Sequence, residues 1–384
     1  MERHLIWFVA AGHLFADISQ GVVPTLLPFF IVEYNLSYAA AAGLVSALSI
    51  ASTVVQPLFG YYADRHSRPW LIPIGVLFAG YGVAFCSLIS NYYFSIFAII
   101  VSGIGIAAFH PEGARFVHIL TGEKKATGMS IFAVGGQAGI AIGPIITMAV
   151  IGVWGLKGTL SLIVPFTIVT IFLAHQVLVY SEDQISPKGR QVVSATLAAK
   201  DAWVPFILLT ATVICRSIIV YGLNTFIPLY WINILHQSKA AGGTALSIMF
   251  GAGIIGTLVG GRLADKYGHR NIILTGFGTL IPLSFVFVSI KNVNVTTALL
   301  VPIGVVLLST YSPLVVLGQK YLPNRIGFAS GITLGVAVAI GGIMAPILGY
   351  IADGYGIPTA MTVLAFLPIL GVILAFMLPY PHSS

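Results

Sequence analysis

The sequence predicts an all-α polytopic membrane protein with twelve transmembrane helices, arranged as two pseudo-symmetric six-helix halves with both termini in the cytoplasm. Three observations predict this class: a very low content of charged residues, a series of long apolar runs and an internal repeat. Charged residues make up 8% of the 384 residues and hydrophobic ones 58%, whereas soluble domains carry about 25% charged residues. This composition excludes an ordinary soluble domain, a disordered chain and a disulfide-rich scaffold.

Twelve apolar runs are long enough to cross a bilayer as helices. The first has no small-residue cleavage site, so we expect it to be retained as a membrane helix. The runs are centred near Gly21, Ala51, Gly80, Ser102, Ala141, Phe166, Arg216, Phe250, Gly278, Val305, Val338 and Ala365. The one sizeable polar connection predicts an N-terminal six-helix bundle over 1–180, a cytoplasmic linker over 181–201 and a C-terminal six-helix bundle over 202–384.

The distribution of Lys and Arg sets the orientation of the chain by the positive-inside rule. With both termini in the cytoplasm, thirteen of the 18 basic residues fall in cytoplasmic segments, and only Lys157, Lys239 and Lys291 fall on the opposite face. The net charge of +7 is therefore a topology signal, and no nucleic-acid partner is expected. We expect a multi-pass protein of the plasma (inner) membrane, embedded in the lipid bilayer.

The two halves of the sequence repeat one another at a nearly constant offset of 200 to 202 residues. The matching landmarks are Pro28 with Pro228, Asp64 with Asp265, Pro111 with Pro313, and Pro144 with Pro346. Parallel repeats of this kind place a binding site between the halves, near the middle of the membrane. Because the repeat is internal, a monomer suffices to form that site.

Two copies of one loop motif follow the second and the eighth run. The first copy contains Gly60, Asp64, Arg65 and Arg68, and the second contains Gly261, Asp265, Lys266 and Arg270. Both resemble the signature loop of the major facilitator superfamily, although Ser67 in the first copy stands where Gly is usual. The resemblance implies the major facilitator fold, with Asp64 facing the start of helix 11 and Asp265 the start of helix 5 in the outward-open state. An Asp at a helix N-terminus is stabilised by the helix dipole; the alternative is that both are only topology-setting charges.

A glycine stripe marks the fifth apolar run. Gly135, Gly139 and Gly143 recur every four residues and Pro144 follows, so one face of this helix is smooth enough for close packing. The string Gly139-x-x-x-Gly143-Pro144 resembles the helix 5 motif of exporters that exchange drug for proton. This similarity favours export over import.

A finer resemblance points to the fosmidomycin-resistance branch of the superfamily. It rests on Gly12-His13-x-x-x-Asp17 with Gln20 in the first run, on Phe109-His110-Pro111-Glu112 with Arg115 in the fourth, and on Arg216-Ser217 in the seventh. The branch implies a proton-coupled exporter of small, often anionic or drug-like compounds, and it leaves the substrate open.

Ionisable residues at membrane depth are costly and are functional candidates by default. His13 and Asp17 share a helix face, with Gln20 close by, and Asp17 is the first candidate for a proton carrier. The alternative is a carboxylate held in a structural hydrogen bond with His13 or with a residue of helix 4.

Helix 4 is expected to carry a second polar group. Glu112 and Arg115 are three residues apart and can pair; Glu112 is then a second proton site and Arg115 an anion-binding group, or the two form a permanent structural ion pair. His110 is a further titrating candidate or a neutral hydrogen-bonding group, since Pro111 leaves a carbonyl unpaired in the preceding turn.

The second half contributes one buried cation, Arg216, and the polar candidates Tyr221, Asn224 and Tyr311. Together with Arg115 and Gln20, these are the expected substrate-binding residues. Guanidinium groups bind phosphonate, phosphate or carboxylate through two hydrogen bonds. In the expected cycle the substrate displaces the carboxylates from Arg115 and Arg216, and external protons then neutralise Asp17 and Glu112.

The sequence therefore predicts a secondary active transporter that carries out proton-coupled efflux by alternating access. One alternative is proton-driven uptake of an organic anion or a metal chelate. A multi-pass membrane enzyme is the alternative from another class, and it lacks the paired aspartates or clustered carboxylates that such chemistry needs. No enzymatic activity, cofactor or metal site is expected; the partners are a small-molecule substrate and protons.

Overall fold

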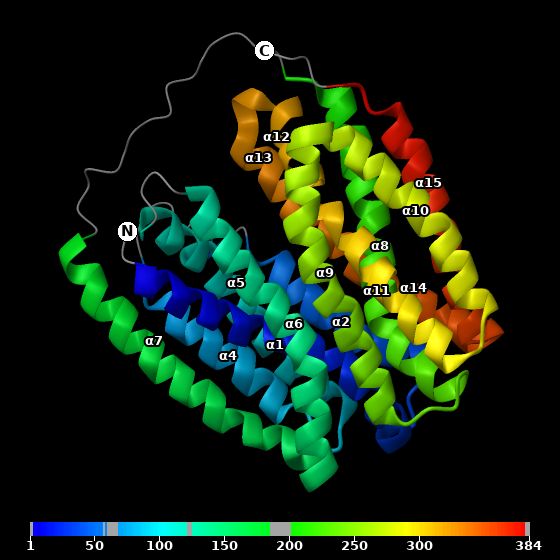
Figure 1. Cartoon of the computed structure of the whole chain (residues 1–384). Coiled ribbons are helices and arrows are strands. Elements are labelled where there is room, and N and C mark those ends of the chain that lie inside the picture. The colour runs from blue at the N-terminus through cyan, green and yellow to red at the C-terminus, as the bar shows by residue number, and fades with distance from the viewer. Residues whose placement is uncertain (1–2, 57, 60–67, 121–124, 185–200, 381–384) are drawn as a thin grey trace.

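The computed structural model describes residues 3–56, 58–59, 68–120, 125–184 and 201–380. Across these residues all the regular elements are helices, and they follow the order expected from the apolar runs (Figure 1). The first half consists of α1 Arg3–Tyr34, α2 Tyr38–Thr53, α4 Leu71–Phe85, α5 Tyr92–Leu120, α6 Lys125–Trp154, a 3-10 turn η1 Leu156–Leu162 and α7 Ile163–Gln184.

The second half repeats this order from α8 Trp203–Asn233 onwards. It continues with α9 Lys239–Tyr267, α10 His269–Ser289, α11 Val293–Ser309, α12 Tyr311–Tyr321, a 3-10 turn η3 Pro323–Arg325, α13 Ile326–Gly331, a π-helical turn η4 Ile332–Val336, α14 Ala337–Tyr355 and α15 Ile357–Met377. Within the described residues, 10 helical spans are long and apolar enough to cross a membrane, and the shorter apolar helices α2 and α4 complete the twelve crossings. The predicted fold class is confirmed.

Helix boundaries show the same repeat as the sequence. Ser37 and Ser238 precede α2 and α9, and each side-chain oxygen accepts a hydrogen bond from a backbone N–H of the first helical turn. Such caps satisfy one of the donors that a helix leaves unpaired at its start. Gly268 and Gly356 end α9 and α14 with φ of 92° and 86°, a left-handed conformation that glycine adopts without a steric penalty.

The glycine stripe of α6 packs directly against α1. A Cβ atom at Gly135 or Gly139 would overlap the carbonyl oxygens of Ala10 and Leu14, and one at Gly143 would lie 2.6 Å from Ile18 O. The stripe thus allows the two backbones to approach closely, as predicted. α1 is fixed in this way against the helix that also borders the second half.

Each half has its own hydrophobic core. Phe30, Phe109 and Phe166 are fully buried in the first core, and Trp231 and Phe277 are buried in the second. Ala141 of the first half also belongs to the second core, so the two cores meet where the halves pack against each other.

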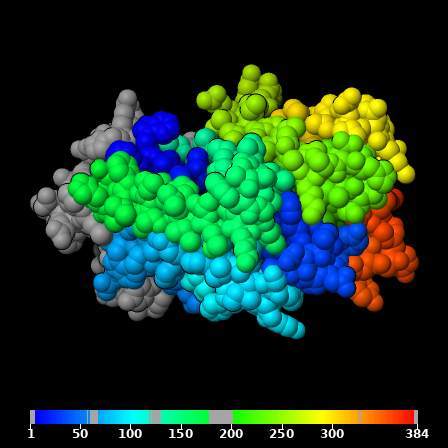
Figure 2. Space-filling model, turned by 90° about the horizontal axis from the view of Figure 1, so that it is seen from below, coloured from blue at the N-terminus to red at the C-terminus, as the bar shows by residue number. Residues whose placement is uncertain are grey.

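The halves meet on the side that the positive-inside rule assigns to the outside. Asp353, at the end of α14, accepts hydrogen bonds from Tyr38 N (2.6 Å) and Ala39 N (2.9 Å) at the start of α2. Deeper in the membrane, Ser46 Oγ donates to Gly342 O. Figure 2 shows the blue start of α2 beside the orange-red end of α14. The structure is therefore closed on its outer side.

Candidate functional site

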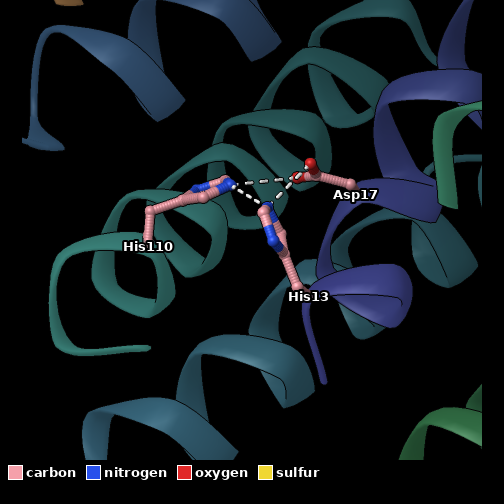
Figure 3. Close-up of side chains that lie close together, drawn as sticks. All are labelled: His13, Asp17 and His110. Carbon is pink, nitrogen blue, oxygen red and sulfur yellow. Dashed lines mark hydrogen bonds and ion pairs between the residues drawn. The ribbon is translucent and has the colours of Figure 1, made fainter. Parts of the chain in front are cut away.

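Three ionisable side chains of the first half converge on one point (Figure 3). His13 and Asp17 lie one turn apart on α1, and His110 reaches them from α5. His13 Nε2 is 2.9 Å from His110 Nε2 and 3.2 Å from Asp17 Oδ2, and His110 Nε2 is 3.3 Å from Asp17 Oδ1. We call His13, Asp17 and His110 the acceptor cluster.

Backbone carbonyls fix the tautomers of both histidines. His13 Nδ1 donates to Phe132 O at 2.7 Å, and His110 Nδ1 donates to Ile106 O at 2.9 Å. A neutral imidazole carries only one N–H, so both Nε2 atoms present lone pairs to one another and to the carboxylate. A hydrogen bond between the two Nε2 atoms therefore requires an additional proton within the acceptor cluster.

The acceptor cluster is enclosed but adjoins the space between the halves. His13 and Asp17 are buried, and His110 is half-buried. Gln20 Nε2 donates to Asp17 Oδ1 at 2.7 Å. Gly136 on α6 covers the cluster, because a Cβ atom there would lie 2.6 Å from Asp17 Oδ2. Gln20 thus orients the carboxylate without neutralising its charge.

Glu112 and Arg115 form a second, separate group on α5. Glu112, which is 1% exposed, lies 3.1 Å from Arg115 Nη1 and accepts a hydrogen bond from Arg68 N at 3.2 Å. The pairing expected from the sequence is present. It ties α5 to Arg68, the described member of the first signature loop, just before α4.

Arg216 lies on α8 in the second half. It bonds to the point where helix 10 of that half is interrupted, between α11 and α12. Its Nε atom donates to Thr310 Oγ1 at 3.0 Å and to Leu307 O at 3.3 Å, and its guanidinium carbon lies 5.3 Å from the Tyr311 ring centroid. Thr310 separates α11 from α12. The expected carboxylate on Arg216 is not found in this conformation: no ion pair of the described residues involves Arg216, and Asp17 lies against the two histidines instead.

A small cavity lies between the halves beside the acceptor cluster. It is just large enough for about one water molecule and is lined by Gln20, Tyr221, Asn224, Val45, Leu48, Ser49 and Ser52. Gln20, Tyr221 and Asn224 were expected to bind substrate, and the structure brings these three together. The lining residues of α2 were missed, because small hydroxyl and aliphatic residues carry no signal that distinguishes them from packing residues.

The second signature loop is open to solvent. The Asp265 side chain is 82% exposed and lies 3.8 Å from His269 Nε2, while the Arg270 guanidinium lies 4.6 Å from the Tyr380 ring centroid and donates to Phe376 O. The Asp265 contact with helix 5 was expected for the outward-open state. Gly60, Asp64 and Arg65 lie outside the described residues.

Comparisons with known proteins agree with the sequence resemblance. Residues 9–346 match the family model described as Major Facilitator Superfamily. The chain is 30% identical to the uncharacterized MFS-type transporter YfnC of Bacillus subtilis, covering 98% of this chain and 92% of that protein. It is 27% identical to the Fosmidomycin resistance protein of Escherichia coli, covering 98% and 93%.

Among solved structures, a bacterial homolog of the human lysosomal transporter Spinster, in an inward-facing and unoccupied conformation, superposes with a TM-score of 0.82. The sequences are 14% identical, and the match covers 98% of this chain and 96% of that one. The predicted resemblance to the superfamily and its fosmidomycin-resistance branch is confirmed by the two relatives, and the predicted fold by this neighbour.

Proposed function

The chain belongs to the major facilitator superfamily, and from that membership we propose that it is a secondary active transporter that exports a small anionic or drug-like compound in exchange for protons. The observation that carries the proposal is the acceptor cluster, which holds a buried carboxylate and two imidazoles beside the cavity between the halves. We propose that it works as a monomer in the plasma membrane, without a cofactor.

In the proposed cycle the acceptor cluster is the proton site. Its two Nε2 atoms and the Asp17 carboxylate share a proton while the cavity faces one side and release it when the substrate enters. Intramembrane carboxylates and histidines serve as such relays in transporters. One proton moved through 100 mV is worth about 2.3 kcal/mol, which is enough for substantial accumulation of substrate.

In the same cycle Arg216 is the proposed anion-binding group. It is 5% exposed, and only its Nε atom has hydrogen-bond partners in the described part of the chain. Two terminal amino groups of the guanidinium are thus left for a phosphonate or carboxylate, which they suit geometrically. Arg115 is engaged by Glu112, so Glu112 and Arg115 are proposed to act chiefly as a structural pair.

Export is proposed over uptake. The glycine stripe with Pro144 resembles an exporter motif, and one relative is named for fosmidomycin resistance and another for multidrug resistance. Uptake of an organic anion is the alternative within transport. A compound that binds the protein can be offered to inverted and to right-side-out vesicles. Accumulation in inverted vesicles alone supports export, and accumulation in right-side-out vesicles alone supports uptake.

The experiment that tests the proposal starts with a panel of small anionic compounds that includes fosmidomycin. Compounds that raise the melting temperature of the purified protein bind it, since a ligand stabilises the folded state by mass action. Proteoliposomes are then loaded with a pH indicator, and an imposed gradient of a binding compound is expected to move protons in the opposite direction. Transport of the compound without proton movement would contradict the proposed coupling.

A further inference from the structure

We propose that the acceptor cluster is also a binding site for a divalent transition metal ion such as Zn²⁺ or Co²⁺. The proposal rests on the positions of His13 Nε2, His110 Nε2 and the two oxygens of the Asp17 carboxylate. The proposal goes beyond the proposed transport function. Metal binding can be tested whether or not the protein moves protons.

The donor atoms of the three side chains lie close enough together for one metal ion, within 4.8 Å of one another. Ligand atoms around a tetrahedral zinc ion lie about 3.3 Å from one another, given metal–ligand distances of about 2.0–2.1 Å. The two histidine nitrogens are 2.9 Å apart. His13 Nε2 is 3.2 Å from Asp17 Oδ2, and His110 Nε2 is 3.3 Å from Asp17 Oδ1. The carboxylate thus faces each histidine with a different oxygen, so a shared metal ion would take both oxygens or require the carboxylate to turn, and the two nitrogens would have to move apart by a few tenths of an ångström. Two imidazoles and one carboxylate form a ligand set that zinc, cobalt, nickel and iron accept.

Both histidines are oriented as metal-ligating histidines are. A ligating imidazole almost always donates its other N–H to a carbonyl or a carboxylate, which fixes the tautomer that leaves a lone pair for the metal. His13 and His110 do so through Phe132 O and Ile106 O. The Phe132 ring also stacks on His13 with ring centroids 4.0 Å apart. The Nε2 lone pairs of both histidines are therefore directed into the acceptor cluster even without a bound cation.

The donor atoms are approachable from α6 because residue 136 is a glycine and has no side chain there. A Cβ atom at Gly136 would overlap His13 Nε2 and lie 2.6 Å from Asp17 Oδ2, so any larger residue would fill the approach to the cluster from α6. Gln20 contacts Asp17 and also lines the cavity between the halves. A metal ion bound here would take the place of the shared proton and keep its fourth position for water or a chelating substrate.

The sequence did not predict a metal site, because the ligands come from two helices and are separated by 97 positions. His13 and Asp17 alone offer two ligands, which also suit a hydrogen-bonded pair. Only the fold adds His110. Since all three residues belong to α1 and α5, a bound metal would hold these two helices together without linking the halves.

The test is a titration of the purified full-length protein, carrying an affinity tag without histidine, with Co²⁺. We expect one Co²⁺ per chain, the visible absorption of tetrahedral or five-coordinate cobalt, and displacement of that absorption by Zn²⁺ but not by Mg²⁺. In His110→Gln the affinity should fall at least about 100-fold, the upper end of what loss of a supporting residue costs. The matched control is His175→Asn, because His175 is exposed on α7 and its replacement should leave the titration unchanged.

Gly136→Ala serves as a second variant that keeps every ligand but blocks the approach. It should weaken Co²⁺ binding, and its melting temperature and gel-filtration profile report whether the fold is intact. Absence of stoichiometric binding to the unaltered protein, or equal affinity in folded His110→Gln, would overturn the proposal. Metal binding in a protein that moves no protons would refute the proposed coupling alone.

Discussion

The two halves differ most at their fourth helices, where a proline stands at matching positions. Pro111 lies inside a continuous α5, whereas helix 10 is divided at Thr310, just before Pro313, into α11 and α12. Proline leaves a carbonyl of the preceding turn without its helical donor. The carbonyls concerned are Ala107 O and Ser309 O, four residues before each proline. The side-chain bonds go instead to nearby carbonyls: His110 Nδ1 donates to Ile106 O, and Arg216 Nε and Thr310 Oγ1 donate to Leu307 O.

The same contrast extends to the first helix of each half. Asp17 on α1 corresponds, at the repeat offset of 200, to Ser217 on α8, which follows Arg216. The first half therefore gathers proton acceptors at the site where the second half holds a cation. The two halves share one architecture but carry different ionisable groups. We propose that the first half binds protons and the second half binds the substrate anion.

Replacement of Asp17 by Asn should have the largest effect. It removes the carboxylate that lies against both histidines, so substrate-driven proton movement in proteoliposomes should fall about tenfold or more, as expected for loss of a coupling energy of 1–3 kcal/mol. Ser217→Ala is the matched control in the second half and should leave coupling intact. Equal loss in the two variants would show that the division between the halves is wrong.

Replacement of Arg216 by Ala should affect substrate binding and stability together. The buried guanidinium makes two charge-assisted hydrogen bonds, so we expect a loss of about 2 kcal/mol in the free energy of unfolding. The melting temperature should also cease to rise with an anionic compound. Thr310→Val removes one acceptor but keeps the cation, and it should retain binding; loss of binding in Thr310→Val but not in Arg216→Ala would contradict the role of the cation.

Gly139→Ala tests the packing that holds the acceptor cluster in place. The added methyl group would overlap Leu14 O, and overpacking of this kind costs about 1–3 kcal/mol. Gly152→Ala on the same helix is the control, because nothing lies within 4 Å of the methyl group that it adds. A melting temperature lowered only in Gly139→Ala is expected; similar values for both would mean that the stripe is not closely packed.

A double-mutant cycle on Glu112 and Arg115 should give the smallest effect. The pair is 3.1 Å apart with Arg115 28% exposed, and contacting residues show coupling energies of about 0.5–3 kcal/mol; we expect the lower end of that range. Glu112→Gln should leave the number of protons moved per substrate unchanged. A lower proton count would instead make Glu112 a second proton site.

Much of the fold follows from features that the sequence displays locally. The length of the apolar runs predicts the membrane crossings. The spacing of Gly135, Gly139 and Gly143 predicts a flat helix face, and the paired prolines reveal the repeat. Each of these features can be read from the sequence without knowing how two helices pack. The packing partner of the stripe, α1, depends on how two helices meet and was not predicted.

The candidate residues were named one by one, and a contact of Asp17 with His13 or with a residue of helix 4 was among the alternatives, but the meeting of all three side chains at one point was not predicted. His13, Asp17 and His110 were each recognised because ionisable side chains are rare at membrane depth. Their convergence depends on the rotation of α1 and α5 about their own axes, which apolar runs leave undetermined. The division of helix 10 at Thr310 is likewise a tertiary outcome, since Arg216 on another helix stabilises it.

The number of protons released when a compound binds tests the central claim most directly. Purified protein in weakly buffered detergent solution is mixed with a compound from the panel that stabilises it, and a pH indicator follows the change. We expect proton release from the unaltered protein and from Ser217→Ala, and no release from Asp17→Asn at a saturating concentration of the compound. Release of equal size from Asp17→Asn would contradict the assignment of the proton site to the first half.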